Sequence, residues 1–162
     1  CISFSEEDVR PMGRIAGGVR AIKLEKDDEV VSMELVEPGQ ELLVVTEKGY
    51  GKRTKVEEYK IQVRGGKGLL TYDKAKFKKT GQLVGAMVVD DDDDVMRINS
   101  NGVIIRMQAK EISRLGRATQ GVKIMNVGED VNIIALAKVA REDELEKEID
   151  GEAENGEQLE LK

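Results

Sequence analysis

Apolar residues in this chain gather into short runs that are bounded by glycine-containing turns. Valine and leucine dominate runs such as residues 41–46 and 83–89, and short runs of this kind between turns are typical of β-strands. We expect strands at residues 21–24, 30–36, 41–46 and 51–56, then at 69–72, 83–89, 95–98 and 103–107, and finally at 122–125 and 131–139. The pair Asn101 and Gly102 predicts a hairpin with a type I′ turn, and Gly49 stands at the equivalent place one unit earlier. The pattern therefore predicts an all-β protein.

A threefold repeat underlies this order of strands. Three acidic residues are each followed six positions later by an arginine and ten positions later by a glycine: the acids are Asp8, Glu58 and Glu111, the arginines Arg14, Arg64 and Arg117, and the glycines Gly18, Gly68 and Gly121. The arginines are 50 and 53 residues apart, close to the period of propeller blades, about 40 to 50 residues. We expect propeller-like blades of four-stranded antiparallel sheet in a partial ring. The predicted parts are a remnant at about 1–13, units at 14–62, 63–116 and 117–140, and a tail at 141–162.

Both ends of the repeat are interrupted. The first residue is cysteine rather than methionine, which leads us to expect a fragment of a longer chain. By the repeat, residues 1–4 correspond to 51–54 and 104–107, and the third unit lacks its second hairpin. A blade of this size cannot bury both faces of its sheet alone, so we expect an unpaired edge at each interrupted end.

The composition excludes the usual catalytic and metal-binding sites. One cysteine cannot form an intramolecular disulfide or a cysteine zinc site, and without histidine no imidazole is available as a ligand or base. We expect no catalytic residue and no metal site. The acidic run at residues 90–94 lacks the ligand spacing of an EF-hand loop and is interpreted as a solvated hairpin. No apolar run could span a bilayer and no signal peptide is recognisable, which predicts a cytoplasmic protein without a membrane partner.

Charge is unevenly distributed along the chain. The net charge is −6, from 26 basic and 32 acidic residues, but residues 141–162 alone contain ten acids and three bases, so the rest of the chain has a net charge of +1. We expect the acidic tail to be disordered. It either keeps the protein soluble or competes with phosphate groups for the cations of the body.

Basic residues gather around the glycine-rich start of each unit, where glycine lets backbone N–H groups approach an anion closely. Repetition would place such a cluster in every blade, so that the ring follows the phosphates of bent duplex DNA by charge rather than by reading bases. The predicted DNA-binding residues are Arg14, Arg20, Lys52, Arg53, Arg64, Lys67, Arg106, Arg114, Arg117 and Lys123. Other interpretations stay open, because such cations also solubilise exposed strands and the repeated acids also pair with arginines or cap turns.

Several strings resemble the blades of the C-terminal β-pinwheel domain of DNA gyrase A. They are EEDVRPMG at residues 6–13, GYGKR at 49–53, QVRGGKG at 62–68, NGVIIRM at 101–107 and EISRLGRATQG at 111–121. The resemblance covers about residues 1–140 and implies approximately the last three blades of the family's six, plus the acidic tail. QVRGGKG is similar to the family's gyrase-A box, with Val63 in place of the first basic residue. Its residues Gln62, Val63, Arg64, Gly65, Gly66, Lys67 and Gly68 are therefore interpreted as a degenerate box, and Ser3 stands where Arg53 and Arg106 stand in the later units.

The resemblance implies a DNA-binding and DNA-wrapping module of a bacterial type IIA topoisomerase, DNA gyrase, which introduces negative supercoils. DNA cleavage, ATP and Mg²⁺ would belong to other parts of the holoenzyme, so no cofactor is expected in this chain. The implied partners are double-stranded DNA and, for the parent protein, gyrase B in a heterotetramer. Two alternatives remain: the C-terminal domain of the corresponding topoisomerase IV protein, and a propeller that binds protein instead of DNA.

Overall fold

The computed structural model describes residues 1–128 and 130–139, so the predicted tail at 141–162 lies outside the described residues. The strands are β1 (Glu41–Thr46), β2 (Tyr50–Lys55), β3 (Leu83–Val89), β4 (Asp94–Asn99), β5 (Ile104–Gln108), β6 (Val122–Lys123) and β7 (Ile133–Val139). Short helical turns connect them: η1 (Glu6–Asp8), η2 (Val56–Glu58), η3 (Lys74–Lys76), α1 (Phe77–Thr80) and η4 (Ala109–Glu111). The predicted all-β fold is confirmed. Over these two ranges, no helix has the length and apolarity that crossing a membrane requires.

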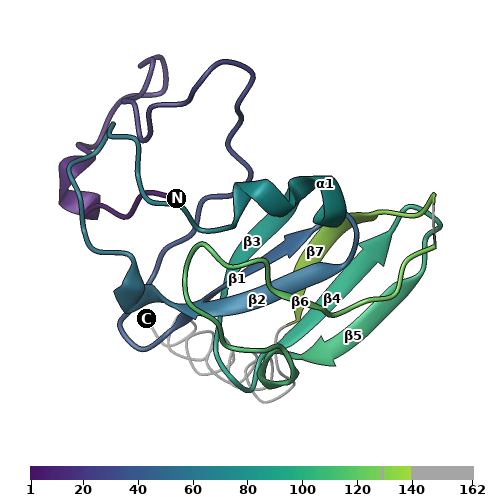
Figure 1. Cartoon of the computed structure of the whole chain (residues 1–162). Coiled ribbons are helices and arrows are strands. Elements are labelled where there is room, and N and C mark those ends of the chain that lie inside the picture. Colours follow the sequence, from purple (N-terminus) through teal and green to yellow (C-terminus); the bar gives the residue numbers. More distant parts are fainter. Residues whose placement is uncertain (129, 140–162) are drawn as a thin grey trace, which may run out of the picture.

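The strands form two antiparallel sheets (Figure 1). One sheet has the order β3-β1-β2-β6 and the other the order β5-β4-β7. Each sheet is built on a hairpin, β1–β2 in the first and β4–β5 in the second. The strand beside each hairpin comes from the following repeat, because β3 pairs with β1 and β7 pairs with β4. Each blade is therefore completed by a strand of the next unit.

Strand β1 lies at the centre of the apolar core and is buried at every position. Its side chains alternate between two faces, and each face belongs to a separate apolar cluster. The first cluster joins the two sheets and consists of Leu43, Val45, Met87, Val89, Val95, Ala109, Ile112, Met125 and Ile133. The second consists of Leu42, Val44, Tyr59, Tyr72 and Val88. A continuous apolar run such as that of β1 is the expected pattern for a strand covered on both sides.

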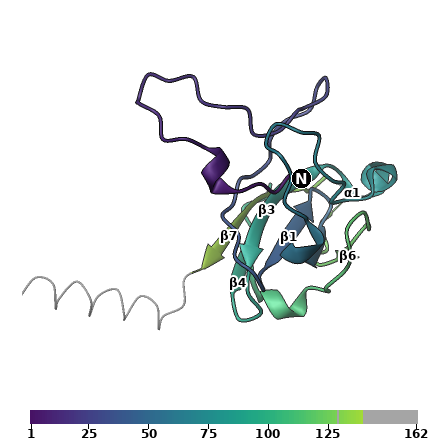
Figure 2. The same cartoon turned by 90° about the vertical axis from the view of Figure 1, so that its left-hand side faces the viewer.

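The apolar segment at residues 30–36 is not a strand, although its equivalent in the next repeat is β3. Strand β3 pairs with the hairpin of the preceding unit, and residues 1–29 contain no hairpin that could serve residues 30–36 in this way. Met33 and Leu35 are consequently 89% and 84% exposed. Figure 2 shows this N-terminal part as extended loops beside the sheets. The strand prediction for residues 30–36 is wrong for lack of a pairing partner.

The strands predicted at residues 21–24 and 69–72 are also wrong, because these segments make a few separate backbone hydrogen bonds with a neighbouring repeat and no continuous ladder. Tyr72 forms an isolated bridge with Thr119, and the Lys23 N–H donates to the Gly66 carbonyl at 2.8 Å. Such isolated bonds hold a loop in place without forming a ladder. These two segments therefore serve as links between units.

The repeat recurs in the backbone hydrogen bonds at the spacing of 50 and 53 residues. The Gln62 N–H donates to the Ser3 carbonyl, and the Leu115 N–H donates to the Arg53 carbonyl, both at 2.8 Å. Two further pairs of N–H to carbonyl bonds are related by the same shift. Gly65 donates to Ala21 as Ala118 donates to Thr71, and Lys23 donates to Gly66 as Asp73 donates to Thr119. The turns η1, η2 and η4 end at the three repeated acids. Successive units thus make the same contacts, while the exact bounds of the units stay a prediction.

The hairpin at Asn101 and Gly102 is confirmed, but its turn is not of type I′. A type I′ turn needs positive φ at both central residues, whereas only Gly102, at 77°, has it. The Asn99 side-chain oxygen accepts the N–H groups of Asn101 and Val103 at 3.0 and 2.9 Å. This side chain organises the turn locally, as asparagine often does, and leaves only the glycine in the left-handed region.

Candidate nucleic-acid interface

The glycines that open the second and third units, Gly68 and Gly121, lie against the backbone of another repeat. Gly68 and Gly121 have φ of 75° and 79°. A Cβ atom on Gly121 would lie 2.7 Å from the Gly51 carbonyl oxygen, and one on Gly68 would overlap the carbonyl of Cys1, which is the equivalent position one repeat earlier. Glycine is required here because the backbone of one unit touches the backbone of another.

Arg64 belongs to the loop with the sequence of the degenerate box and fixes that loop to the preceding unit. It is half-buried. Its Nε donates to the Asp8 carbonyl at 3.3 Å, and its Nη1 donates to the Arg20 carbonyl. These acceptors are neutral, so they hold the guanidinium in place without cancelling its charge. Lys67, three residues later, is exposed.

The equivalent arginines of the neighbouring units are also accessible. Arg14 is exposed and Arg117 is half-buried. Neither guanidinium forms an ion pair within residues 1–128 and 130–139. The Arg117 backbone N–H donates to the Glu58 carboxylate at 3.1 Å, so one of the repeated acids stabilises the loop that carries the next arginine. Arg20 and Lys123 are exposed beside these loops.

Lys52 and Arg53 have internal roles. Lys52 is fully buried, and its Nζ donates to the Gly116 carbonyl at 2.7 Å and to the Thr119 hydroxyl at 3.0 Å. Burial lowers the pKa of this ammonium to about 8, because it disfavours the charged form. Both residues lie on β2, between β1 and β6, where neighbouring repeats cover the strand. We therefore leave them out of the surface that DNA could contact.

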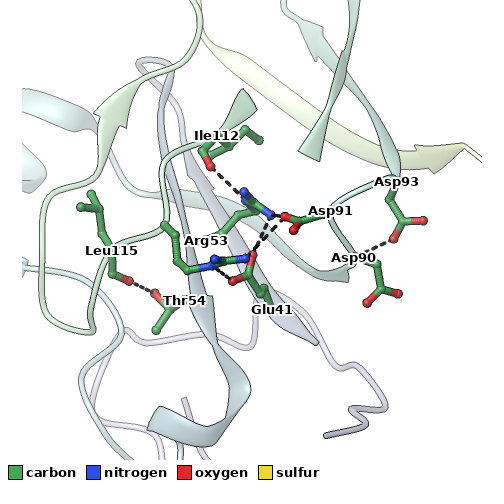
Figure 3. A network of polar contacts seen from close by, with 9 residues as sticks. Glu41, Arg53, Thr54, Asp90, Asp91, Asp93, Ile112 and Leu115 are labelled. Carbon is green, nitrogen blue, oxygen red and sulfur yellow. Dashed lines mark hydrogen bonds and ion pairs between the residues drawn. The ribbon is translucent and has the colours of Figure 1, made fainter. Parts of the chain in front are cut away.

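Arg53 is the centre of a network of charged groups (Figure 3). It is 4% exposed, pairs with Glu41 at 2.7 Å and with Asp91, and donates from Nε to the Ile112 carbonyl at 2.9 Å. Arg114 binds the same two carboxylates from a half-exposed position, and this pairing raises its pKa. The hydrogen bond from Arg53 lowers the pKa of the Asp91 carboxyl group. The network joins β1 and β2 to the turn between β3 and β4.

The acidic run at residues 90–94 is a turn whose carboxylates meet cations from other elements. Besides Asp91, Asp93 pairs with Lys138 at 3.2 Å and Asp94 pairs with Arg106. The part of the chain that the structure describes holds no cluster of acids arranged for a metal ion. The interpretation as a simple solvated hairpin therefore missed these ion pairs, which link residues far apart in the sequence.

Residues 1–37, 40–90 and 93–140 match the family described as "DNA gyrase C-terminal domain, beta-propeller". The chain belongs to this family. DNA gyrase A of Mycolicibacterium smegmatis is 45% identical over 149 residues, which cover 91% of this chain and 17% of that protein. The chain thus spans about a sixth of the length of this relative.

Two solved structures share the gyrase C-terminal fold. "Structure of DNA gyrase A C-terminal domain" superposes with a TM-score of 0.78 at 29% identity, covering 85% of this chain and 46% of that one. "Crystal structure of the C-terminal domain of DNA topoisomerase IV" also has a TM-score of 0.78, at 23% identity, covering 84% and 42% of the two chains. At that identity the second likeness shows the fold alone. The sequence comparison is what favours gyrase A.

One group of cations in this gyrase-type domain escaped the sequence analysis. Lysine occupies four of the six positions from Lys74 to Lys79, in η3 and α1, and all four side chains are exposed: Lys74, Lys76, Lys78 and Lys79. The missed signal was this density of lysine, since short lysine-rich segments often form nucleic-acid patches. The segment has no lysine-rich counterpart in the other repeats, so its lysines do not stand at repeated positions.

Proposed function

We propose that this chain is the DNA-binding and DNA-wrapping module of DNA gyrase A and contributes no catalytic residue of its own. Membership of the gyrase C-terminal domain family and 45% identity to a gyrase A protein support this assignment. The parent protein would act in the cytoplasm, in a heterotetramer with gyrase B that introduces negative supercoils. Cleavage, ATP and Mg²⁺ would belong to regions outside this chain.

The observation that carries the proposal is the accessible arginine at the same place in each repeat. Arg14, Arg64 and Arg117 remain without a carboxylate partner in the described ranges. Arg20, Lys67 and Lys123 are exposed close to them in sequence. We call these six residues the basic rim. Arg106 and Arg114 engage Asp94, Glu41 and Asp91 and are placed outside the rim.

A rim of this kind suits the backbone of a bent duplex. Neutralising a phosphate releases counterions, and each contact contributes about 0.9 to the slope of log K against log salt. Bending a site of 20 to 30 base pairs by 40 to 90° costs on the order of 1 to 6 kcal/mol. Many weak contacts must offset this cost, so binding should depend on salt and tolerate changes of sequence.

The test is a salt titration of the binding of the full chain to a 40-base-pair duplex. The variant Arg14→Gln/Arg64→Gln/Arg117→Gln should bind more weakly, with a salt slope less negative by about 2.7 if each arginine neutralises one phosphate. A matched control is Lys26→Gln/Lys55→Gln/Lys110→Gln, which removes three exposed charges outside the rim and should keep most of the slope. Absence of any salt-dependent affinity for the duplex would contradict the function and favour a propeller that binds protein.

A further inference from the structure

A second basic site lies between the turn that joins β1 to β2, helix α1 and strand β6. It is a hollow of about 250 Å³, lined by Lys48, Tyr50, Lys79, Lys123, Val127 and Gly128. The three lysines come from three separate elements, and only Lys123 belongs to the basic rim. We call this site the lysine hollow.

Backbone contacts hold the walls of the lysine hollow together. Tyr50 and Lys123 are directly paired in the β2–β6 ladder. The Lys48 N–H donates to the Thr80 carbonyl at 3.0 Å, which fixes the hairpin turn to the end of α1. The Gly49 carbonyl accepts the Ile124 N–H at 2.8 Å, and Gly49 lies so close to Met125 that no larger residue would fit. The positions from which the lysines extend are therefore set by the fold.

The charges of the hollow are not neutralised by the protein. Within residues 1–128 and 130–139, none of the three ammonium groups forms an ion pair or a hydrogen bond. Lys79 Nζ lies over the Tyr50 ring, 5.6 Å from its centroid, which orients the ammonium through a cation–π contact. The nearby Glu47 carboxylate instead accepts the Gln82 N–H at 2.8 Å. Three like charges around one hollow repel each other, and a bound anion would relieve that repulsion.

The middle unit of the repeat carries neutral residues at the positions of Lys48, Tyr50 and Lys123. One repeat later, the positions of Lys48 and Tyr50 are occupied by Asn101 and Val103, and the position of Lys123 corresponds to Leu70 one repeat earlier. The β4–β5 hairpin forms with its neutral turn just as β1–β2 does. A hairpin of this kind therefore forms without a lysine at the position of Lys48, so the charge there is free to serve a ligand.

We propose that the lysine hollow binds a backbone phosphate of duplex DNA, with Lys48 and Lys79 adding to the charge of Lys123 from the basic rim. This inference rests on the proposed function and assigns it a further contact site. Ammonium groups on flexible stems act as point charges that suit a phosphate from several directions. The exposed Lys74, Lys76 and Lys78 continue the positive charge along η3 and α1. An extended row of this kind favours a polyanion over a single small anion.

The experiment compares the full chain with the variant Lys48→Gln/Lys79→Gln, which keeps every residue of the basic rim, and with the control Lys26→Gln/Lys55→Gln. Affinity for a 40-base-pair duplex is measured over a range of salt concentrations, and pyrophosphate alone is titrated by calorimetry as a second probe. All four lysines are exposed, so the midpoints of urea unfolding should agree and exclude a folding defect. We expect the hollow variant to lose several-fold in duplex affinity, with a salt slope less negative by about 0.9 for each phosphate released, while the control changes little.

Each other outcome has a distinct meaning. Duplex binding by the hollow variant that equals that of the full chain would overturn the lysine hollow and leave the proposed function intact. Loss of pyrophosphate binding with unchanged duplex binding would overturn the assignment to DNA, because the site would then serve a free anion. Failure of all three proteins to bind duplex would instead contradict the proposed function, which separates the two conclusions.

Discussion

Two adjacent cations on β2 are both buried, and they differ in what surrounds them. Arg53 meets the carboxylates of Glu41 and Asp91, so its charge is compensated inside the protein. In the part of the chain that the structure describes, the Lys52 ammonium donates to neutral acceptors, the Gly116 carbonyl and the Thr119 hydroxyl, and the Glu58 carboxylate offsets only part of the effect of burial on its pKa. A buried ammonium whose charge is only partly compensated releases its proton more easily, so the ionisation of Lys52 should affect stability above pH 8.

Lys52 makes stability depend on pH in a predictable direction. Its pKa is about 8 in the folded protein and about 10.4 in an unfolded chain. Between these values the unfolded chain holds a proton that the folded protein has released, so the free energy of unfolding rises with pH by at most about 1.4 kcal/mol per pH unit. Urea unfolding at pH 7.5, 8.5 and 9.5 should therefore show the wild-type chain gaining stability relative to Lys52→Met. The exposed Lys55→Met is the control, and parallel curves for wild type and Lys52→Met would refute the prediction.

Contacts between successive units depend on short elements that approach each other closely. Strand β6 has only two residues, yet it completes the first sheet because Gly121 allows it to lie against β2. The equivalent Gly68 makes the same approach to Cys1 one repeat earlier. Side-chain size at these glycines therefore controls whether one unit can attach to the next.

Replacing Gly121 by alanine should be more destabilising than the same change at Gly102. Both glycines have positive φ, 79° and 77°, so each substitution costs about 1 to 2 kcal/mol from backbone conformation. A Cβ at Gly121 would also press on Gly51, whereas one at Gly102 would meet nothing within 4 Å, and the added crowding should cost about 1 to 3 kcal/mol more. Denaturant unfolding of both variants measures the difference. Equal losses would show that the contact between β2 and the start of the third unit adjusts freely.

Across the whole molecule, several acidic residues of the body are paired with cations, while the cations of the basic rim and the lysine hollow are left for an outside anion. The acids of the run at residues 90–94 include Asp91, Asp93 and Asp94, which pair with cations of the body. The basic rim and the lysine hollow lack such partners in the described ranges. The sequence from 141 to 162 carries a net charge of −7 on the same chain, which gives these carboxylates a high effective concentration near the exposed cations.

A chain that ends at Val139 should bind duplex DNA more tightly at low salt than the full chain. Removal of the tail removes ten carboxylates that would compete with phosphate for the same cations. The gain should shrink as salt rises, because screening weakens both interactions. Equilibrium binding at low and at high salt measures it, and a full-length chain with the ten acids changed to amides controls for length. Identical affinity with and without the tail would leave it as a solubilising terminus.

The candidate site was only partly predictable from the sequence. Arg64 and Arg117 were found because they recur at one register, and the structure leaves both partly accessible. Lys52 and Arg53 carry the same kind of charge, but their burial depends on strands contributed by other units. Lys48, Lys79 and Lys123 lie up to 75 positions apart, so no local pattern could indicate that they line one hollow.

The sequence by itself determined the two hairpins and the runs that form β3 and β7, the spacing of the repeat and the membership of the gyrase C-terminal domain family, because these depend on residue types at fixed intervals. The tertiary structure alone decided that β3 and β7 complete the hairpins of preceding units and that residues 30–36 remain unpaired. It also decided which cations are buried and which stay in solvent. The physical reason is that strand pairing and desolvation are properties of neighbours in space, and in this protein those neighbours come from different repeats.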